Sequence, residues 1–230
     1  MRVLLTNDDG IHAPGLRALE DAVLALGWEP HVVAPAHEQS QCGHRVTTHE
    51  PLVVQQVSER RHAVHGTPAD CVRIALFALS LKPDLVLSGV NAGGNMGQDI
   101  VISGTVAAAR EATYHGHHAI ALSHYMIRTL PVDWKRTTDW IAHLLGETHA
   151  RDRAARSFWN INLPHLPPEV RTLPPRILCH PAHSPLNVSY DLSEEGGYTY
   201  SASYAARPRD PGSDVEACFA GNVALSLLSL

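Results

Sequence analysis

Two adjacent carboxylates, Asp8 and Asp9, are the first residues of the chain whose position could support chemistry. They follow an apolar segment in the stretch VLLTNDDG, which predicts that both lie where a buried strand ends. Adjacent acids repel each other and resist desolvation, so in one interpretation one acid caps the following turn while the other faces water. In the other, they bind a hard divalent cation, because Mg²⁺ and Mn²⁺ prefer oxygen ligands.

Two later polar loops offer further oxygen ligands for such a cation. Ser40 lies in the segment PAHEQSQCGHRVTT, and Asn91 lies in GVNAGGNMGQD, which follows another apolar stretch. The carboxyl ends of parallel strands meet at one edge of a sheet, so both side chains are predicted to lie near Asp8 and Asp9. His12 could instead ligate a softer metal, act as a base or face solvent.

The segment SGVNAGGNMGQDIVISGTVAAAREA, residues 88–112, lacks both standard nucleotide fingerprints, the P-loop with its lysine and G-x-G-x-x-G. It does place Ser103, Gly104 and Thr105 at the start of a predicted helix. Free backbone N–H groups and two hydroxyls at that position could bind an anion such as phosphate. The alternative is that Ser103 is an ordinary N-cap.

A carboxylate–metal centre beside an anion-binding helix start indicates metal-assisted hydrolysis of a phosphate ester. In that chemistry Asp8 or Asp9 could orient the attacking water or accept its proton. The competing mechanism uses an aspartyl-phosphate intermediate. Its usual signature spaces two acids by one residue, which the adjacent pair does not match, but the sequence alone leaves the choice open.

The elements that must position these residues alternate between strands and helices. We expect an α/β fold with a mostly parallel sheet and helices on both faces. The predicted strands are 2–7, 29–34, 84–88, 119–123 and 158–163, with a small hairpin at 52–57 and 62–65, and the predicted helices are 14–26, 67–79, 103–115 and 132–145.

The character of the sequence changes after Pro164, although we expect one domain over residues 1–230. Its core is predicted at about 1–165 and a C-terminal hairpin segment at about 185–230. Tyrosines recur from Tyr190 to Tyr204 among Ser, Thr and Gly, which predicts a projecting antiparallel hairpin used in oligomerisation. The apolar end, GNVALSLLSL, is predicted to return to the core.

Composition argues against several classes of protein. The formal net charge is −5 with 16 neutral histidines, which argues against general nucleic-acid binding. No apolar run approaches the roughly 20 residues that cross a bilayer, so no membrane partner is expected. The N-terminus does not resemble a signal peptide, and we expect a cytoplasmic protein.

Four motifs in this order resemble the SurE family of stationary-phase survival proteins, which are 5′/3′-nucleotidases. They are NDDGIHAPG at the N-terminus, GTPADCV at 66–72, SGVNAGGNMG at 88–97 and SGTVAAAREA at 103–112. NINLP at 160–164 and SDVEA at 213–217 extend the resemblance over nearly the whole chain.

This resemblance implies a Rossmann-like, three-layer α/β sandwich with a swapped C-terminal hairpin that forms homodimers or homotetramers. It implies metal-dependent hydrolysis of nucleoside 5′- and 3′-monophosphates to nucleoside and phosphate, and possible activity on short polyphosphate. One Mg²⁺ or Mn²⁺ per subunit would be held by Asp8, Asp9, Ser40 and Asn91. Asn95 and the Ser103-Gly104-Thr105 helix start would bind the phosphate.

Two departures from the family pattern affect these loops. Gln41 follows Ser40 where the family usually has glycine, and Ile102 precedes Ser103 where a tyrosine is common. Both leave the substrate range open. They also leave room for a rival hypothesis, a non-catalytic sensor of nucleotides or other phospho-ligands on the same fold.

Overall fold

A computed structural model describes residues 1–148, 155–194 and 196–230. Residue 195 falls within the predicted C-terminal segment and lies outside the described residues. The central element is a nine-stranded sheet in the order β3-β4-β2-β1-β5-β6-β7-β11-β8. The strands are β1 (Arg2–Thr6), β2 (Glu29–Pro35), β3 (Val54–Ser58), β4 (Arg61–Val64), β5 (Leu85–Ala92), β6 (Ala119–His124), β7 (Ser157–Leu163), β8 (Arg176–Leu178) and β11 (Val223–Ser229).

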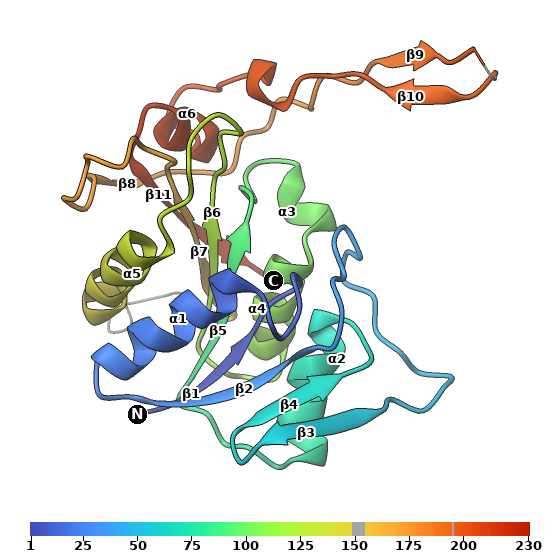
Figure 1. Cartoon of the computed structure of the whole chain (residues 1–230), viewed down its shortest axis with the longest axis vertical. Helices are drawn as coiled ribbons and strands as arrows, with labels where there is room; N and C mark the ends of the chain where they lie inside the picture. Colours follow the sequence, from blue (N-terminus) through green and yellow to red (C-terminus); the bar gives the residue numbers. More distant parts are fainter. Residues whose placement is uncertain (149–154, 195) are drawn as a thin grey trace.

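The middle of this sheet is parallel, which confirms the predicted fold class. Strands β4, β2, β1, β5, β6 and β7 run the same way, while β3 and β11 are antiparallel to their neighbours β4 and β7. The apolar tail therefore does return to the core, as strand β11 (Figure 1).

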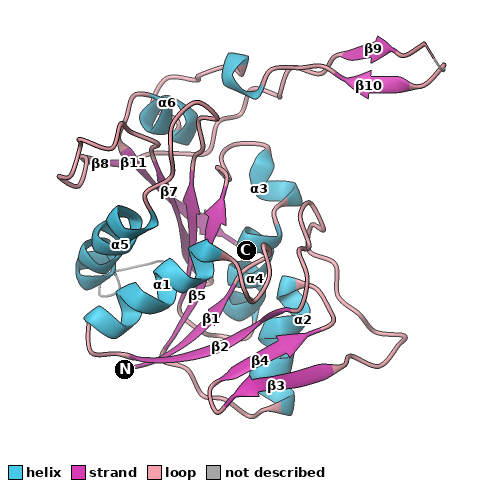
Figure 2. Cartoon of the chain, viewed as in Figure 1, coloured by secondary structure: helices cyan, strands magenta, loops and turns pink. Residues whose placement is uncertain are grey.

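Helices cover both faces of the sheet and complete three layers (Figure 2). Helix α1 (Pro14–Ala25) and helix α5 (Trp134–Thr148) pack on one face, where Leu16 and Ile141 belong to one buried cluster. Helix α2 (Pro68–Arg73), its π-helical continuation η1 (Ile74–Ala78) and helix α4 (Gly104–Tyr114) cover the other face. The predicted helix at 67–79 is thus one segment with two hydrogen-bonding patterns.

Strand β5 is longer than the predicted strand at 84–88. It continues through Gly89 to Ala92, with an irregular register against β6 between Ser88 and Asn91. A Cβ at Gly89 would lie 2.2 Å from the carbonyl oxygen of Leu122, so only glycine permits this close strand approach. Asn91 therefore lies at the end of β5 rather than in a loop beyond it.

The structure contains the predicted C-terminal hairpin and several further short elements. Strands β9 (Tyr190–Leu192) and β10 (Tyr198–Tyr200) form a separate antiparallel pair that projects from the body (Figure 1). Two short helices, α3 (Asp99–Ile102) and α6 (Asp214–Phe219), the 3₁₀ turn η2 (Tyr204–Ala206) and strand β8 were not predicted. The boundaries given for the core and C-terminal segment remain predictions. Among the described residues, no helix is long and apolar enough to cross a membrane.

Candidate active site

Asp8 lies just beyond β1, and its carboxyl group is buried. Only 5% of the residue is exposed, and its Oδ1 accepts a 2.5 Å hydrogen bond from the Thr105 hydroxyl. Burial is the largest influence and raises the pKa of Asp8 from its usual 3.8 to about 6. The Thr105 hydrogen bond opposes that rise, and the negative charge of Asp9 adds to it.

Asp9 connects the end of β1 to the end of β5. Its Oδ2 accepts a 3.1 Å hydrogen bond from the backbone N–H of Ala92. Burial raises the pKa of Asp9, the Ala92 hydrogen bond lowers it, and the nearby carboxylate of Glu38 raises it. The two acids therefore sit together in a poorly solvated position where each resists ionisation.

The start of α4 approaches Asp8 closely because residue 104 is glycine. A Cβ at Gly104 would lie 2.9 Å from the Cβ of Asp8 and 3.0 Å from the Sγ of Cys42. Any larger residue would push the helix start away from the carboxylate. Gly104 and Thr105 thus bring a helix N-terminus, with its partial positive charge, to Asp8.

Asn91 and Ser40, the two other predicted metal ligands, lie on segments joined to the acid pair. The Asn91 amide nitrogen donates to the carbonyl of Gly93 at 2.9 Å, which directs the amide oxygen away from that bond. Ser40 is exposed and its hydroxyl donates to Glu38 at 2.6 Å. The preceding residue, Gln39, donates its backbone N–H to the carbonyl of Asp8 at 2.7 Å. Ser40 is therefore the next residue in the chain after one that contacts Asp8 directly.

The hydroxyls predicted to bind phosphate both have partners within the protein. Ser103 is the N-cap of α4 and accepts from the backbone N–H of Val106 at 3.1 Å, as the alternative interpretation expected. Thr105 donates to Asp8. Because the Val106 N–H donates to Ser103 and the Thr105 N–H interacts with Asp8, the anion-binding capacity of this position rests on the backbone N–H of Gly104.

Asn95 takes part in a buried polar network that the sequence did not reveal. Its side-chain amide donates to Ser123 at 2.8 Å, and its carbonyl accepts from Asn160 at 2.9 Å and Asn162 at 3.1 Å. The signal that could have shown this network is the pair of asparagines two residues apart in the apolar strand FWNINL, since they share one face of β7. The network fixes the loop between β5 and α3.

A C-terminal segment clamps the same loop from the other side, and it too was missed. Asp99 accepts from the Tyr204 hydroxyl at 2.7 Å and from the buried guanidinium of Arg207 at 2.6 Å. Asp214 accepts from the backbone N–H of Gly97 at 2.9 Å. The loop after β5 is therefore held by residues more than 100 positions away in the sequence, with separations of 105, 108 and 117.

The long loop of residues 36–53 is anchored on α4 through a buried glutamate. Glu111 accepts from His44 at 2.7 Å, from Arg73 at 2.5 Å and from His115 at 2.9 Å. Burial alone would raise the pKa of Glu111, but these three donors together lower it from 4.5 to about 2. Glu111 remains ionised and holds the loop that contains Ser40.

The departure at Gln41 has a visible backbone consequence. Gln41 adopts a left-handed conformation with φ 57°, which glycine adopts without strain. The backbone therefore has a conformation that suits glycine, and the Gln41 side chain makes it strained. Ile102 is 47% exposed, and its carbonyl accepts from the backbone N–H of Gly43 at 3.0 Å. Position 102 thus contacts the same loop through its backbone.

The predicted donor set has the chemistry that a hard divalent cation prefers. It combines two adjacent carboxylates with raised pKa values, an amide oxygen and a hydroxyl, all oxygen ligands. No cluster of three or more His, Cys, Asp or Glu side chains suited to a metal occurs in the described parts of the chain. A cation here would therefore take Asn or Ser oxygens and water beside the carboxylates. His12 is exposed.

Comparison with known proteins gives a consistent result. The family model described as survival protein SurE matches residues 3–177. A Nostoc sp. protein whose name assigns it provisionally as a 5′-nucleotidase is 46% identical over 228 residues, which cover 99% of each chain. The 5′-nucleotidase SurE of Geotalea daltonii is 38% identical over 234 residues, covering 100% of this chain and 93% of the relative. The crystal structure of the SurE protein from Aquifex aeolicus matches with a TM-score of 0.86 and 30% identity, covering 100% of this chain and 93% of that chain.

Proposed function

Because the chain belongs to the SurE family, we propose that it is a 5′-nucleotidase that converts nucleoside monophosphates to nucleoside and phosphate. The observation that supports this most strongly is the Asp8–Asp9 pair, with Asp8 buried and Asp9 partly buried, placed against the start of α4, where Gly104 permits a close approach. Carboxylates for a cation and a helix N-terminus for an anion then lie side by side, which is the combination that phosphate ester hydrolysis needs.

The proposed reaction requires one divalent cation, Mg²⁺ or Mn²⁺. Asp8, Asp9, Ser40 and Asn91 would hold it, and when bound it would polarise a phosphoryl oxygen and lower the pKa of a water.

The chain's own groups would position the phosphate and handle the proton. The backbone N–H of Gly104 and the partial positive charge of the α4 N-terminus would stabilise the negative charge of the phosphate. Asp8, held in place by the Thr105 hydroxyl, and Asp9, held by the N–H of Ala92, would orient the attacking water or accept its proton. Asn95 would bind the phosphate beside them, and its side-chain amide is oriented by the hydrogen bond that it donates to Ser123.

Phosphate release from a panel of nucleoside 5′- and 3′-monophosphates and short polyphosphate tests this function. Assays with Mn²⁺, with Mg²⁺ and with EDTA should show metal-dependent turnover of nucleotides, and EDTA should abolish it. Asp8→Asn should reduce turnover by at least about 10²-fold while the protein stays folded. Nucleotide binding without turnover on any ester would instead support the non-catalytic sensor.

We also propose that the chain forms a homodimer or homotetramer through the β9–β10 hairpin and acts in the cytoplasm on free nucleotides. The hairpin is the basis of the first proposal, since Leu192 is 67% exposed and Tyr198 is 76% exposed. Apolar and aromatic side chains at this exposure are typical of surfaces that pair with another chain.

A further inference from the structure

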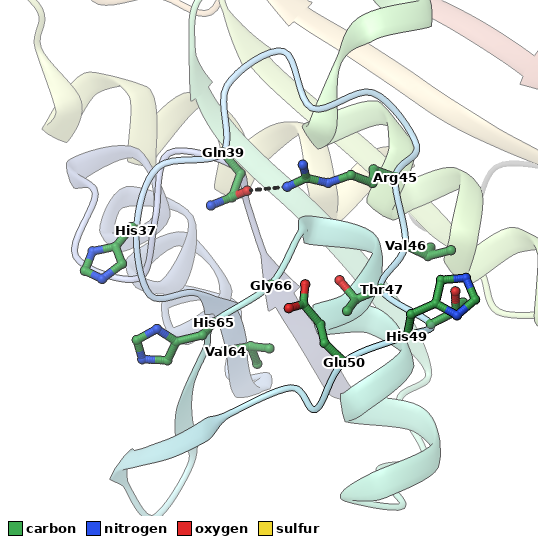
Figure 3. Close-up of a pocket in the computed structure, with 11 residues that line it drawn as sticks. His37, Gln39, Arg45, Val46, Thr47, His49, Glu50, Val64, His65 and Gly66 are labelled. Atoms are coloured by element: carbon green, nitrogen blue, oxygen red, sulfur yellow. Dashed lines mark hydrogen bonds between the residues drawn. The ribbon is translucent and has the colours of Figure 1, made fainter.

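A hollow of about 590 Å³ lies between the loop of residues 36–53 and the end of β4, at residues 64–66. Figure 3 shows His37 and His65 together at one side, Gln39 and Arg45 across the opening, and Thr47 and Glu50 facing them. Its volume falls in the range of small-molecule sites, roughly 300–1,000 Å³.

The hollow is connected to the proposed catalytic centre through Gln39. The Gln39 backbone N–H donates to the carbonyl of Asp8 at 2.7 Å, while its side chain lines the hollow. The next residue is the proposed metal ligand Ser40. A phosphate ester bound at Asp8 and Asp9 would therefore have the rest of its molecule within reach of this hollow.

The wall formed by the loop is anchored by a buried carboxylate. Asp70 is fully buried and accepts from the N–H of Thr47 at 2.8 Å, from the Thr47 hydroxyl at 2.8 Å and from the N–H of Thr67 at 3.0 Å. The Thr67 hydroxyl donates to the carbonyl of Arg45 at 2.6 Å. These bonds fix the backbone beneath Arg45 and Thr47, so the hollow is a preformed feature of the fold.

The chemistry of the lining suits a nucleoside better than a second phosphate. The positive charge of Arg45 is offset by the negative charge of Glu50, so the hollow has no excess of positive charge to attract another anion. The His37 and His65 rings, with centroids 5.6 Å apart, offer flat surfaces and ring nitrogens to a heteroaromatic base. The Gln39 Oε1 already accepts a 3.3 Å hydrogen bond from Arg45, so Gln39 offers its amide N–H groups to a ligand. Glu50 can accept hydrogen bonds from ribose hydroxyls.

We propose that this hollow binds the nucleoside of the substrate, with His37, His65, Gln39 and Arg45 contacting the base. The inference rests on the proposed nucleotidase function and adds the site that would distinguish nucleotides from simpler phosphate esters. Binding energy gained there would favour substrates with a base over those without one.

The test compares a nucleoside 5′-monophosphate with glycerol phosphate, which has no base. In the variant H37A/H65A, the ratio of kcat/KM for the nucleotide to kcat/KM for glycerol phosphate should fall about tenfold. Arg45→Ala should lower the same ratio. The matched control Arg60→Ala, whose arginine pairs with Glu29 at the other end of β4, should leave the ratio unchanged. An unchanged ratio in H37A/H65A would overturn the proposal.

A second measurement separates this inference from the proposed activity. If the wild-type protein hydrolyses no phosphate ester, the nucleotidase proposal fails, and equilibrium dialysis with the nucleoside monophosphate then tests the hollow directly. Binding by the wild-type protein that H37A/H65A weakens about tenfold would support the nucleoside site. Absent or unaltered binding would overturn it.

Discussion

At the scale of single residues, Asp8 illustrates how the site is built at the expense of stability. Its raised pKa of about 6 means that the folded state holds the proton more tightly than the unfolded chain does, with its usual pKa of 3.8. The stability contributed by the protonated carboxyl is full below pH 3.8 and is lost as the pH rises through 6. Above that window the ionised carboxylate costs up to about 3 kcal/mol in metal-free protein.

The variant Asp8→Asn should therefore be more stable than the wild type in EDTA at about pH 7.5, by up to about 3 kcal/mol. The amide oxygen still accepts from Thr105 and has no charge to desolvate. Urea unfolding at about pH 7.5 and about pH 4 measures the effect, and the gain should shrink at the lower pH. Mn²⁺ should stabilise the wild type more than the variant. A variant less stable than the wild type at pH 7.5 would show that the ionised carboxylate supports the fold.

Gly104 is the second residue whose substitution should change the site, because it lets the start of α4 approach Asp8. Alanine would favour the helix by its propensity, but its Cβ would lie 2.9 Å from the Cβ of Asp8. Gly104→Ala should therefore displace the α4 start and lower kcat/KM by about tenfold or more. The control is Gly146→Ala in α5, where the nearest atom is 3.9 Å away and activity should not change. Equal kcat/KM in both variants would show that the close approach has no role in catalysis.

At the scale of elements, α4 anchors the loop of residues 36–53 through Glu111. Its pKa is lowered from 4.5 to about 2, so its contribution to stability is present above pH 4.5 and is lost as the pH falls toward 2. Glu111→Gln should lower the free energy of unfolding by about 3 kcal/mol at neutral pH, and the difference should narrow below pH 4.5. Hydrogen exchange of residues 43–47 should accelerate.

The matched control for Glu111→Gln is Asp139→Asn, which removes an exposed ion pair with Lys135 on α5. A surface pair of this kind contributes at most about 1 kcal/mol, so its loss should be small. If the two variants lost similar stability, Glu111 would be no more than a surface charge.

The elements predicted from the sequence were those with strong local patterns. The apolar stripe of α1 and the capping box of α2, formed by Thr67 and Asp70, are local, and both helices were found. The predicted strand at 84–88 stopped short of Gly89, because the sequence does not show that glycine there permits a close approach to Leu122 and lets β5 continue. The short helices α3 and α6 have too few residues for a periodic pattern to be distinct.

In the candidate site, too, the residues predicted from the sequence are those with a local pattern. Asp8 and Asp9 stand out because adjacent acids end an apolar strand, and Thr105 because it begins a helix. The partners of Asn95 lie on strands β6 and β7, 28, 65 and 67 residues away, so no local pattern predicts them. The clamp formed by Asp99 and Arg207 is equally hidden, because it depends on where the C-terminal segment crosses the fold.

At the scale of the whole molecule, the C-terminal segment joins the site to the projecting hairpin. It runs from the exposed β9–β10 pair to the Tyr204 and Arg207 contacts on Asp99, beside the loop after β5 (Figure 1). An exchanged hairpin would therefore connect oligomer assembly to the loop that contains Asn95. In such an oligomer, the hairpin would be the region that links assembly most directly to the site.

Replacing the paired residues Leu192 and Tyr198 by serine should convert the oligomer to monomers. The two residues face each other across β9 and β10, so the double change removes the exposed apolar surface while the strands can still pair. Size-exclusion chromatography with light scattering measures the mass, and Leu24→Ser on α1, where the leucine is 53% exposed, is the control that should keep the oligomer intact. A monomeric wild type, or a double variant of unchanged mass, would refute assembly through the hairpin.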